Sequence, residues 1–339
     1  MSTHNTAADP NSTPRVLPVQ TEASVRQSHP AEGTGECSTR SEPPSMNDLA
    51  LEAIGDLEEL LSRTTPLPGL STGLAGFDAI TGGLQPGQLG VIAGRPAMGK
   101  TAFVMQTALH VSLRLEKTVA VFSLQSTARQ LFQRLLYSFA GVPVKKVRLG
   151  IADRCDWSAI TRAAEVLAKS RMQIDDDPGL SVFELRARVR HWKSLHDVQL
   201  VVIDKMACLE SGTRIGSSPH RFSFDGVTLN LKAMARELKI PVLGVAELNR
   251  KPDERLGMNR GWPQLKDLRK RKAIVGMADF VALLLRHSYY AENARERKKF
   301  GGRSDLIVFK NADRSTRVLP LVFNKKLLHF EEPRLPKIF

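Results

Sequence analysis

The sequence predicts an α/β fold: a mainly parallel sheet with helices on both faces and a C-terminal β-hairpin. Three observations predict it. A short apolar run, a glycine-containing loop and a helical apolar pattern follow one another over residues 87–113. Further apolar runs then alternate with helical patterns, which is typical of βαβ units. Two runs with strand-like alternation, at 305–315 and 317–331, predict the closing hairpin.

The first of these units carries GRPAMGKT, which has the spacing G-x-x-x-x-G-K-T of a phosphate-binding loop, or P-loop. Its glycines let successive backbone N–H groups surround an anion, and the following helix points its positive end at the same place. Lys100 is expected to reach the β- and γ-phosphates of a nucleotide, and the Thr101 hydroxyl to hold Mg²⁺. The alternative is a chance glycine turn beside a lysine. The expected nucleotide-binding residues are Gly94, Arg95, Pro96, Ala97, Met98, Gly99, Lys100 and Thr101.

The composition favours a soluble protein with an anionic partner. The 339 residues, 42% of them hydrophobic, suffice for one sizeable α/β domain with appendages. A formal net charge of +14 favours nucleic acid as partner, the alternative being a basic surface without one. The three cysteines form no C-x-x-C pair, so neither a disulfide framework nor a zinc site is indicated. No apolar run approaches the roughly 18 residues of a membrane span, and no signal peptide is evident, so we expect a cytoplasmic location.

The chain before the P-loop unit falls into two predicted parts. Residues 1–45 are rich in Ser, Thr, Pro, Glu and Gly and have few large apolar side chains, which predicts a disordered tail. Residues 46–64 place apolar side chains on one stripe of a helix that begins near Asn47 or Asp48. That apolar stripe needs a partner, which is either the chain's own domain or a neighbouring subunit. The main domain is expected at 65–332, and residues 333–339 form a second tail.

The segment after the P-loop helix is expected to alternate strands and helices. A strand at 117–124 precedes a long helix that ends near Gly141, and a further helix follows from about Asp156, its N-cap candidate. A short strand lies within 171–180. Ser181 and Glu184 have the spacing of a capping box, which predicts the start of the next helix.

The apolar run at 198–206 predicts a buried parallel strand that delivers Asp204 at its carboxyl end. In a P-loop protein this carboxylate is the Walker B aspartate, which orients the water shell of Mg²⁺. The alternative is an aspartate that only caps the next turn. Because ligands of such sheets bind at the carboxyl ends of the strands, Asp204 is expected beside the P-loop.

The remaining pattern predicts a helix at 228–240, a strand at 241–248 that ends near Glu247, and a strand at 278–288. The basic run RERKKFGGR at 295–303 is expected to be an exposed loop at the tip of the sheet.

Taken in order, several of these motifs resemble the C-terminal motor domain of DnaB-type hexameric replicative helicases. They are LSTGLAGFDAITGGLQPGQLGVIAGRPAMGKT, VFSLQ, LVVID, LKAMARELKIPVLGVAELNR, the DLR at 267–269 and FKNADRS, within 46–332. The resemblance implies a RecA-like P-loop ATPase that uses ATP and Mg²⁺, assembles as a homo-oligomeric ring, a hexamer, and threads single-stranded DNA. It also implies contact with other replication proteins, association with the nucleoid, and a linker helix at 47–63 that docks on the adjacent subunit. Residues 1–45 do not resemble the family's globular N-terminal domain, so the resemblance does not extend to the primase contact and loading functions carried there.

The sequence departs from the family at three catalytic positions. Gln125 stands where the family has the glutamate that polarises the attacking water, and Glu247 stands where it has a glutamine that senses the γ-phosphate. In the family's K-Q-R motif this chain keeps Lys310 but has Ala312 in place of the arginine finger. One hypothesis is that Glu247 and Gln125 have exchanged roles and that Arg314 replaces the finger. The candidate catalytic residues are therefore Gln125, Glu247, Lys310 and Arg314.

The family's DNA-contacting loop begins at the DLR motif, and here it continues as the cationic run Arg269, Lys270, Arg271 and Lys272. Such a run would neutralise phosphates of single-stranded DNA without reading sequence; the alternative is a solvated basic turn.

Three function classes follow from these patterns. The first is a helicase motor, and the second is a catalytically degenerate relative that binds DNA and nucleotide, or modulates a helicase, without efficient hydrolysis. The third, a recombinase-type or clock-type RecA relative, is disfavoured by LKAMARELKIPVLGVAELNR and by the DLR loop.

Overall fold

The computed structural model describes residues 45–48, 50–51, 54–55, 58, 67–209, 224–255, 257, 260–310 and 316–333. The chain divides into two units, residues 1–59 and 60–339. In the first unit the described residues from Met46 to Glu58 are helical. Ser45 caps this helix: its hydroxyl accepts from the Asp48 N–H, and the Asp48 carboxylate accepts from the Ser45 N–H. The predicted helix therefore begins one residue earlier than expected; residues 1–44 and 334–339 lie outside the described part.

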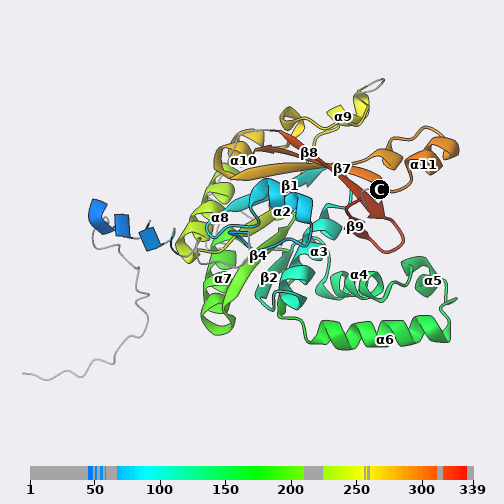
Figure 1. Ribbon diagram of the computed structural model, residues 1–339, viewed down its shortest axis with the longest axis horizontal. Helices are drawn as coiled ribbons and strands as arrows, with labels where there is room; N and C mark the ends of the chain where they lie inside the picture. Colours follow the sequence, from blue (N-terminus) through cyan, green and yellow to red (C-terminus); the bar gives the residue numbers. More distant parts are fainter. Residues whose placement is uncertain are drawn as a thin grey trace, which may run out of the picture. The chain divides into compact units, whose positions relative to one another are not determined.

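The second unit is built on one sheet with the strand order β3-β2-β4-β5-β1-β6-β7-β8-β9 (Figure 1). All pairings from β3 to β6 are parallel, and those from β6 to β9 are antiparallel. This confirms the predicted α/β fold with a mainly parallel sheet and a C-terminal hairpin. The strands are β1 (Leu89–Gly94), β2 (Thr118–Ser123), β3 (Met172–Asp175), β4 (Val198–Asp204), β5 (Val242–Glu247), β6 (Phe280–Arg286), β7 (Arg303–Lys310), β8 (Arg317–Asn324) and β9 (His329–Glu331).

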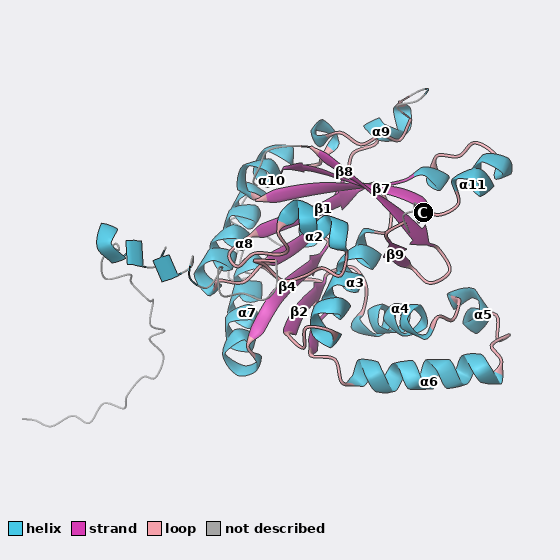
Figure 2. Cartoon of the chain, viewed as in Figure 1, coloured by secondary structure: helices cyan, strands magenta, loops and turns pink. Residues whose placement is uncertain are grey.

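Helices cover both faces of the sheet, as predicted (Figure 2). Successive residues of β4 enter opposite cores: Val201 and Ile203 face one, and Leu200 and Val202 face the other, as the period of two in a strand requires. The first core is closed by α7 (Val182–His196), α8 (Phe224–Leu238) and α10 (Arg271–Met277). The second core is closed by α2 (Ala75–Thr81), α3 (Lys100–Leu113) and α4 (Ala128–Ala140).

Two predicted helix boundaries are confirmed by their caps. Ser181 and Glu184 form the predicted capping box at the start of α7. α4 ends at Gly141, whose φ of 72° is a left-handed conformation that glycine adopts without strain.

Two other predictions about helices are wrong. α6 (Arg154–Ala168), which lies beside α4, is capped by Asp153, whereas Asp156 is the third helical residue and completes the capping box. The run at 295–303 is not a loop: Asn293 caps α11 (Ala294–Phe300), and β7 begins at Arg303. Three short helices were not predicted: α5 (Val144–Arg148), α9 (Lys251–Glu254) and α10. Among the described residues, no helix is long and apolar enough to cross a membrane.

Candidate nucleotide site

The candidate site lies where the central parallel strands end at one edge of the sheet. β5 lies between β4 and β1, and the strand ends are level: Gly94 pairs with Glu247, and Asp204 pairs with Ser123 of β2. This is the edge at which parallel α/β sheets bind their ligands. The sheet therefore brings the P-loop, the predicted Walker B aspartate and Glu247 together from three separate parts of the sequence.

The P-loop has the backbone geometry of an anion-binding turn. Ala97 and Gly99 have φ values of 64° and 96°, so the loop is concave before α3 begins at Lys100. A side chain at Gly99 would also collide with the ring of Phe330, 2.9 Å from an added Cβ. The second glycine of the motif is therefore required both by its backbone conformation and by the close approach of the C-terminal strand.

Lys100 is nearly buried, with 9% of its surface exposed. Its ammonium donates to the carbonyl oxygens of Gly94 and Arg95, at 3.0 Å each. Burial lowers the pKa of Lys100 to about 8, opposed by the negative charges of Glu247 and Asp204. A buried cation whose two described hydrogen bonds go to neutral carbonyl groups is well placed to receive phosphate oxygens.

Thr101 and Asp204 form the adjacent part of the site. The Thr101 hydroxyl donates to Oδ1 of Asp204 at 3.2 Å, and Asp204 is 6% exposed. Burial raises the pKa of Asp204, and the bond from Thr101 and the charge of Lys100 oppose that rise. The Thr101 hydroxyl and the Asp204 carboxylate offer oxygen ligands of the kind that Mg²⁺ prefers. Among the described residues, no group of three or more His, Cys, Asp or Glu could hold a metal ion.

Glu247 contacts two cations at the same edge. Its carboxylate lies 3.5 Å from the ammonium of Lys205, which directly follows Asp204, and 3.8 Å from the guanidinium of Arg269. Gln125, two residues beyond the end of β2, is exposed on the far side of Asp204. The structure thus places Glu247 between Asp204 and the P-loop, and Gln125 beyond Asp204.

Arg95 contributes its backbone to the P-loop, but its side chain turns away from the loop. The guanidinium donates to the Asp253 carboxylate at 2.6 and 2.9 Å and to the Leu248 carbonyl at 3.2 Å. Tyr290 donates to the other Asp253 oxygen at 2.8 Å. The expectation that Arg95 binds nucleotide therefore concerns its backbone only, because its side chain is hydrogen-bonded to Asp253 of α9.

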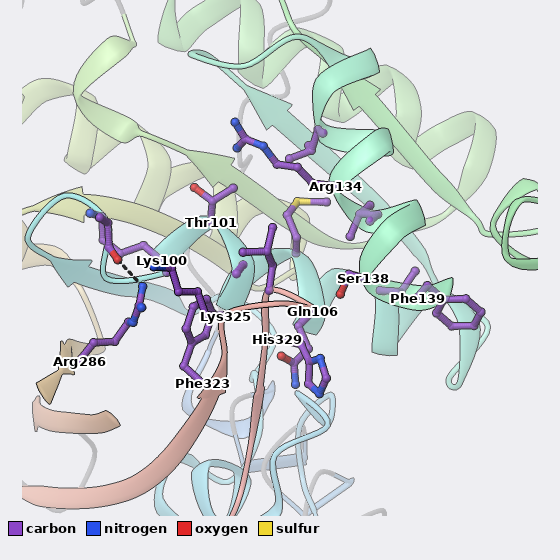
Figure 3. A pocket seen from close by; sticks show the side chains of 18 of the residues that line it. Lys100, Thr101, Gln106, Arg134, Ser138, Phe139, Arg286, Phe323, Lys325 and His329 are labelled. Carbon is purple, nitrogen blue, oxygen red and sulfur yellow. Dashed lines mark hydrogen bonds between the residues drawn. The ribbon is translucent and has the colours of Figure 1, made fainter. Parts of the chain in front are cut away.

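A cavity of about 850 Å³ opens beside the P-loop, between α3, α4 and the turn from β8 to β9 (Figure 3). Sequence reasoning missed Arg286, which donates to the Ala97 carbonyl at 2.7 Å and stacks on Phe323 at 4.2 Å. Its one sequence signal is its place at the end of β6, the strand beside β1. Other side chains at the cavity include Met105, Gln106, Leu131, Arg134, Leu135, Ser138, Phe139, Lys325, Leu328 and His329.

The cationic run at 269–272 does not form a single loop. Arg269 and Lys270 lie in the turn before α10, and Arg271 and Lys272 lie in its first turn. Arg269 pairs with Glu247, Lys270 lies 5.9 Å from the ring centroid of Phe224, and Lys272 is exposed. The side chains of Arg271 and Lys310, and the whole of Arg314 and Ala312, lie outside the described part of the structure.

Comparisons with known proteins agree on one family. The sequence profile described as the DnaB-like helicase C terminal domain matches residues 69–332. A replicative DNA helicase DnaB from Leifsonia xyli subsp. xyli is 32% identical over 288 residues, which cover 85% of this chain and 61% of that protein. The same protein from Rhodothermus marinus is 37% identical over 236 residues, covering 68% of this chain and 24% of that protein. The chain spans about three fifths of the length of most relatives of this kind.

Solved structures show the same likeness. One of them, described as an ATPase domain, superposes with a TM-score of 0.75 at 26% identity, covering 86% of this chain and 100% of that one. A DnaB-like replicative helicase, described with its interactions with primase, gives a TM-score of 0.74 at 26% identity, covering 85% of this chain and 68% of that one.

Proposed function

Because the chain belongs to the family of DnaB-like helicase C-terminal domains, we propose that it is an ATP-binding motor that forms a ring on single-stranded DNA and couples ATP hydrolysis to unwinding in replication. One observation carries the proposal: the buried Lys100 and Asp204 and the half-buried Thr101 lie together at the carboxyl edge of the sheet, where Thr101 donates to Asp204. A buried cation beside a hydroxyl and a carboxylate is the donor set that a magnesium-bound triphosphate requires.

The binding roles follow from these positions. The concave backbone from Gly94 to Gly99 surrounds the phosphates, and Lys100 exchanges its carbonyl partners for β- and γ-phosphate oxygens. Thr101 and Asp204 hold Mg²⁺, directly or through water. Mg²⁺ at this point would offset the charge of the phosphate oxygens. The cavity between α3 and α4 is large enough for the rest of the nucleotide.

Hydrolysis depends on the residues in which the chain departs from its family. Gln125 can orient a water molecule but cannot accept its proton, so a base must come from elsewhere. Glu247 pairs in register with Gly94, the last residue of the P-loop strand, which supports the exchange of roles between Glu247 and Gln125. Lys310 and Arg314 are proposed to reach the neighbouring subunit's nucleotide.

A second candidate function is supported by the same departures. Removal of a general base typically costs about 10²- to 10⁴-fold in rate, and loss of an arginine finger about 10³- to 10⁵-fold. If Glu247 and Arg314 do not compensate for Gln125 and Ala312, the chain is a nucleotide-dependent DNA-binding or helicase-modulating protein without efficient hydrolysis.

The remaining parts of the proposal concern partners. Arg269, Lys270, Arg271 and Lys272 are proposed to contact the phosphates of single-stranded DNA, which the formal net charge of +14 supports. We also propose a hexameric ring in the cytoplasm, associated with the nucleoid through DNA and with other replication proteins.

The proposal is tested by mass photometry of the full chain with ATP, ADP and single-stranded DNA, beside a phosphate-release assay. A motor is expected to form larger assemblies with ATP and to release phosphate faster when DNA is added. Assembly without release selects the second candidate. No assembly under any of these conditions contradicts the ring-forming motor.

The exchange of roles has its own test. Glu247→Gln is expected to lower the DNA-stimulated ATPase rate by about 10²-fold or more, because it removes the only carboxylate proposed as base. Thr127→Ala is the matched control: its cap lies at the start of α4, and the rate should change little. An unchanged rate in Glu247→Gln would end the hypothesis that Glu247 replaces the missing base.

A further inference from the structure

Glu247 introduces a negative charge beside the place where a third phosphate would lie. It ends β5, between the strand that carries Asp204 and the strand that enters the P-loop. Burial has the largest effect on the pKa of Lys100 and lowers it. The negative charge of Glu247 has the second largest effect and raises that pKa. A carboxylate close enough to shift the pKa of Lys100 would, if its charge were not compensated, also repel the γ-phosphate that Lys100 is proposed to hold.

Lys205 provides a compensating charge. Its ammonium lies 3.5 Å from Oε1 of Glu247, and only about a quarter of either side chain is exposed. Its φ of 77° turns the chain sharply at the end of β4, directly after Asp204. Burial dominates the pKa shifts of both Lys100 and Asp204, and the charge of Lys205 contributes to each. Lys205 is therefore within electrostatic reach of both groups proposed to hold the phosphates and the metal.

Arg269 provides a second cation from another element. Its backbone N–H donates to the Glu247 carbonyl at 3.1 Å, and Leu248 and Leu268 form an antiparallel bridge beside it. The backbone therefore keeps Arg269 opposite Glu247 whether or not their side chains pair. Because Arg269 is 59% exposed and 3.8 Å from the carboxylate, solvent weakens its contribution more than that of Lys205.

From this geometry we infer that Lys205 is a positioning residue for the γ-phosphate: it neutralises and holds Glu247, and with Arg269 it makes the charge around that carboxylate net positive. The inference rests on the proposed nucleotide binding and adds a residue to it. ADP lacks the phosphate that approaches Glu247, so Lys205 matters for ATP and little for ADP. The inference therefore predicts that loss of Lys205 changes the affinity for ATP more than the affinity for ADP. Loss of a residue needed only for folding would affect both nucleotides equally.

The test measures the binding of ATPγS and of ADP, each with Mg²⁺, to the full chain by titration calorimetry. Lys205→Ala is expected to weaken ATPγS binding about tenfold and ADP binding less than about twofold, since only the triphosphate approaches the released carboxylate. Lys205→Arg should bind both nucleotides as the unaltered chain does. The double variant Lys205→Ala, Glu247→Gln should regain ATPγS affinity to within about threefold, because the repelling charge is gone.

The matched control is Lys193→Ala, which removes a lysine paired with Asp197 on α7, and both affinities should stay unchanged. If Lys205→Ala does not fold, Lys205→Gln with and without Glu247→Gln makes the same comparison. Equal loss for ATPγS and ADP, or no recovery in the double variant, overturns the inference. If the unaltered chain binds neither nucleotide, the proposed function fails and the inference with it; if it binds both and the variants show no difference, the inference alone fails.

Discussion

At the scale of single residues, burial determines the chemistry of Lys100. The lysine is the first residue of α3, with 9% of its surface exposed and two carbonyl groups as acceptors. Loss of solvation is the main reason that its pKa falls to about 8. The positive charge of Lys100 is therefore present at neutral pH and is lost as the pH rises above about 8.

This pKa predicts a pH dependence of nucleotide binding. A bound triphosphate favours the charged form of Lys100, so the pKa is higher in the complex than in the free protein. Above about pH 8 binding must take up a proton, and affinity for ATPγS should fall about tenfold between about pH 7 and about pH 9. Calorimetric titrations check this, with circular dichroism at each pH as the control for folding. A flat affinity profile over that range would show that the Lys100 charge is not titrating.

Sequence motifs identified the site residues whose positions follow from local backbone structure. They did not identify contacts between residues that are far apart along the chain. The spacing of the P-loop motif indicated Lys100 and Thr101, and the buried strand indicated Asp204, because their places follow from local structure. The side chain of Arg95 could not be placed, since its partner Asp253 is 158 residues away along the chain. Lys205 directly follows Asp204, yet its contact with Glu247 depends on the order of β4 and β5 in the sheet.

At the scale of elements, the turn that carries Arg269 is fixed by a buried ion pair. Asp267 is fully buried, and Arg255 donates to both of its oxygens at 2.7 and 2.8 Å. The Asp267 carboxylate also accepts from the Gln264 N–H at 2.7 Å. This pair joins the segment after β5 to the turn before α10 and so maintains the position of Arg269 opposite Glu247.

Removal of Arg255 should therefore destabilise the protein. Arg255→Ala leaves the Asp267 carboxylate buried without its cation, and the free energy of unfolding should fall by about 3 kcal/mol or more. The control is Arg186→Ala, which breaks a partly exposed pair with Glu237 and should cost about 1 kcal/mol or less. Denaturant titration measures both values. Equal costs in the two variants would mean that the buried pair does not stabilise this turn.

The elements that sequence patterns predicted are those with strong periodicity. The buried parallel strands and the long helices have enough apolar side chains to show their period, and each was found close to its expected place. α11 was missed because it is short and mostly charged, so it has no apolar periodicity. Its helical signals are the Asn293 cap and Phe300, which stacks on His287. The cap of α6 was misassigned because Asp153 and Asp156 both belong to one capping box.

At the scale of the whole molecule, the excess of basic residues predicts salt-dependent binding to single-stranded DNA. Replacement of Arg269, Lys270 and Lys272 by alanine should weaken binding and reduce the slope of log affinity against log salt by about two. The control replaces Arg154, Arg162 and Lys169, three exposed cations on or next to α6, which gives the same change in charge. Fluorescence anisotropy at several salt concentrations measures both variants. Equal slopes in the two triple variants would mean that the run at 269–272 has no special contact with DNA.

The coupling of nucleotide to DNA that we propose depends on contacts between distant parts of the chain, which local sequence patterns do not determine. Glu247 pairs with Lys205 at the candidate nucleotide site and with Arg269 in the turn proposed to contact DNA. A change in the charge or position of Glu247 therefore affects both cations. In the proposed motor, a bound γ-phosphate would change the charge around Glu247 and so the contacts of Arg269. By thermodynamic linkage, bound DNA would then change nucleotide affinity by the same factor.

The most direct test of the proposed motor is the affinity of the full chain for single-stranded DNA with ATPγS and Mg²⁺, with ADP and Mg²⁺, and without nucleotide. We predict that ATPγS strengthens binding by about tenfold over ADP, a coupling of about 1.4 kcal/mol. The same DNA affinity in all three states would contradict the claim that this chain couples a nucleotide to DNA.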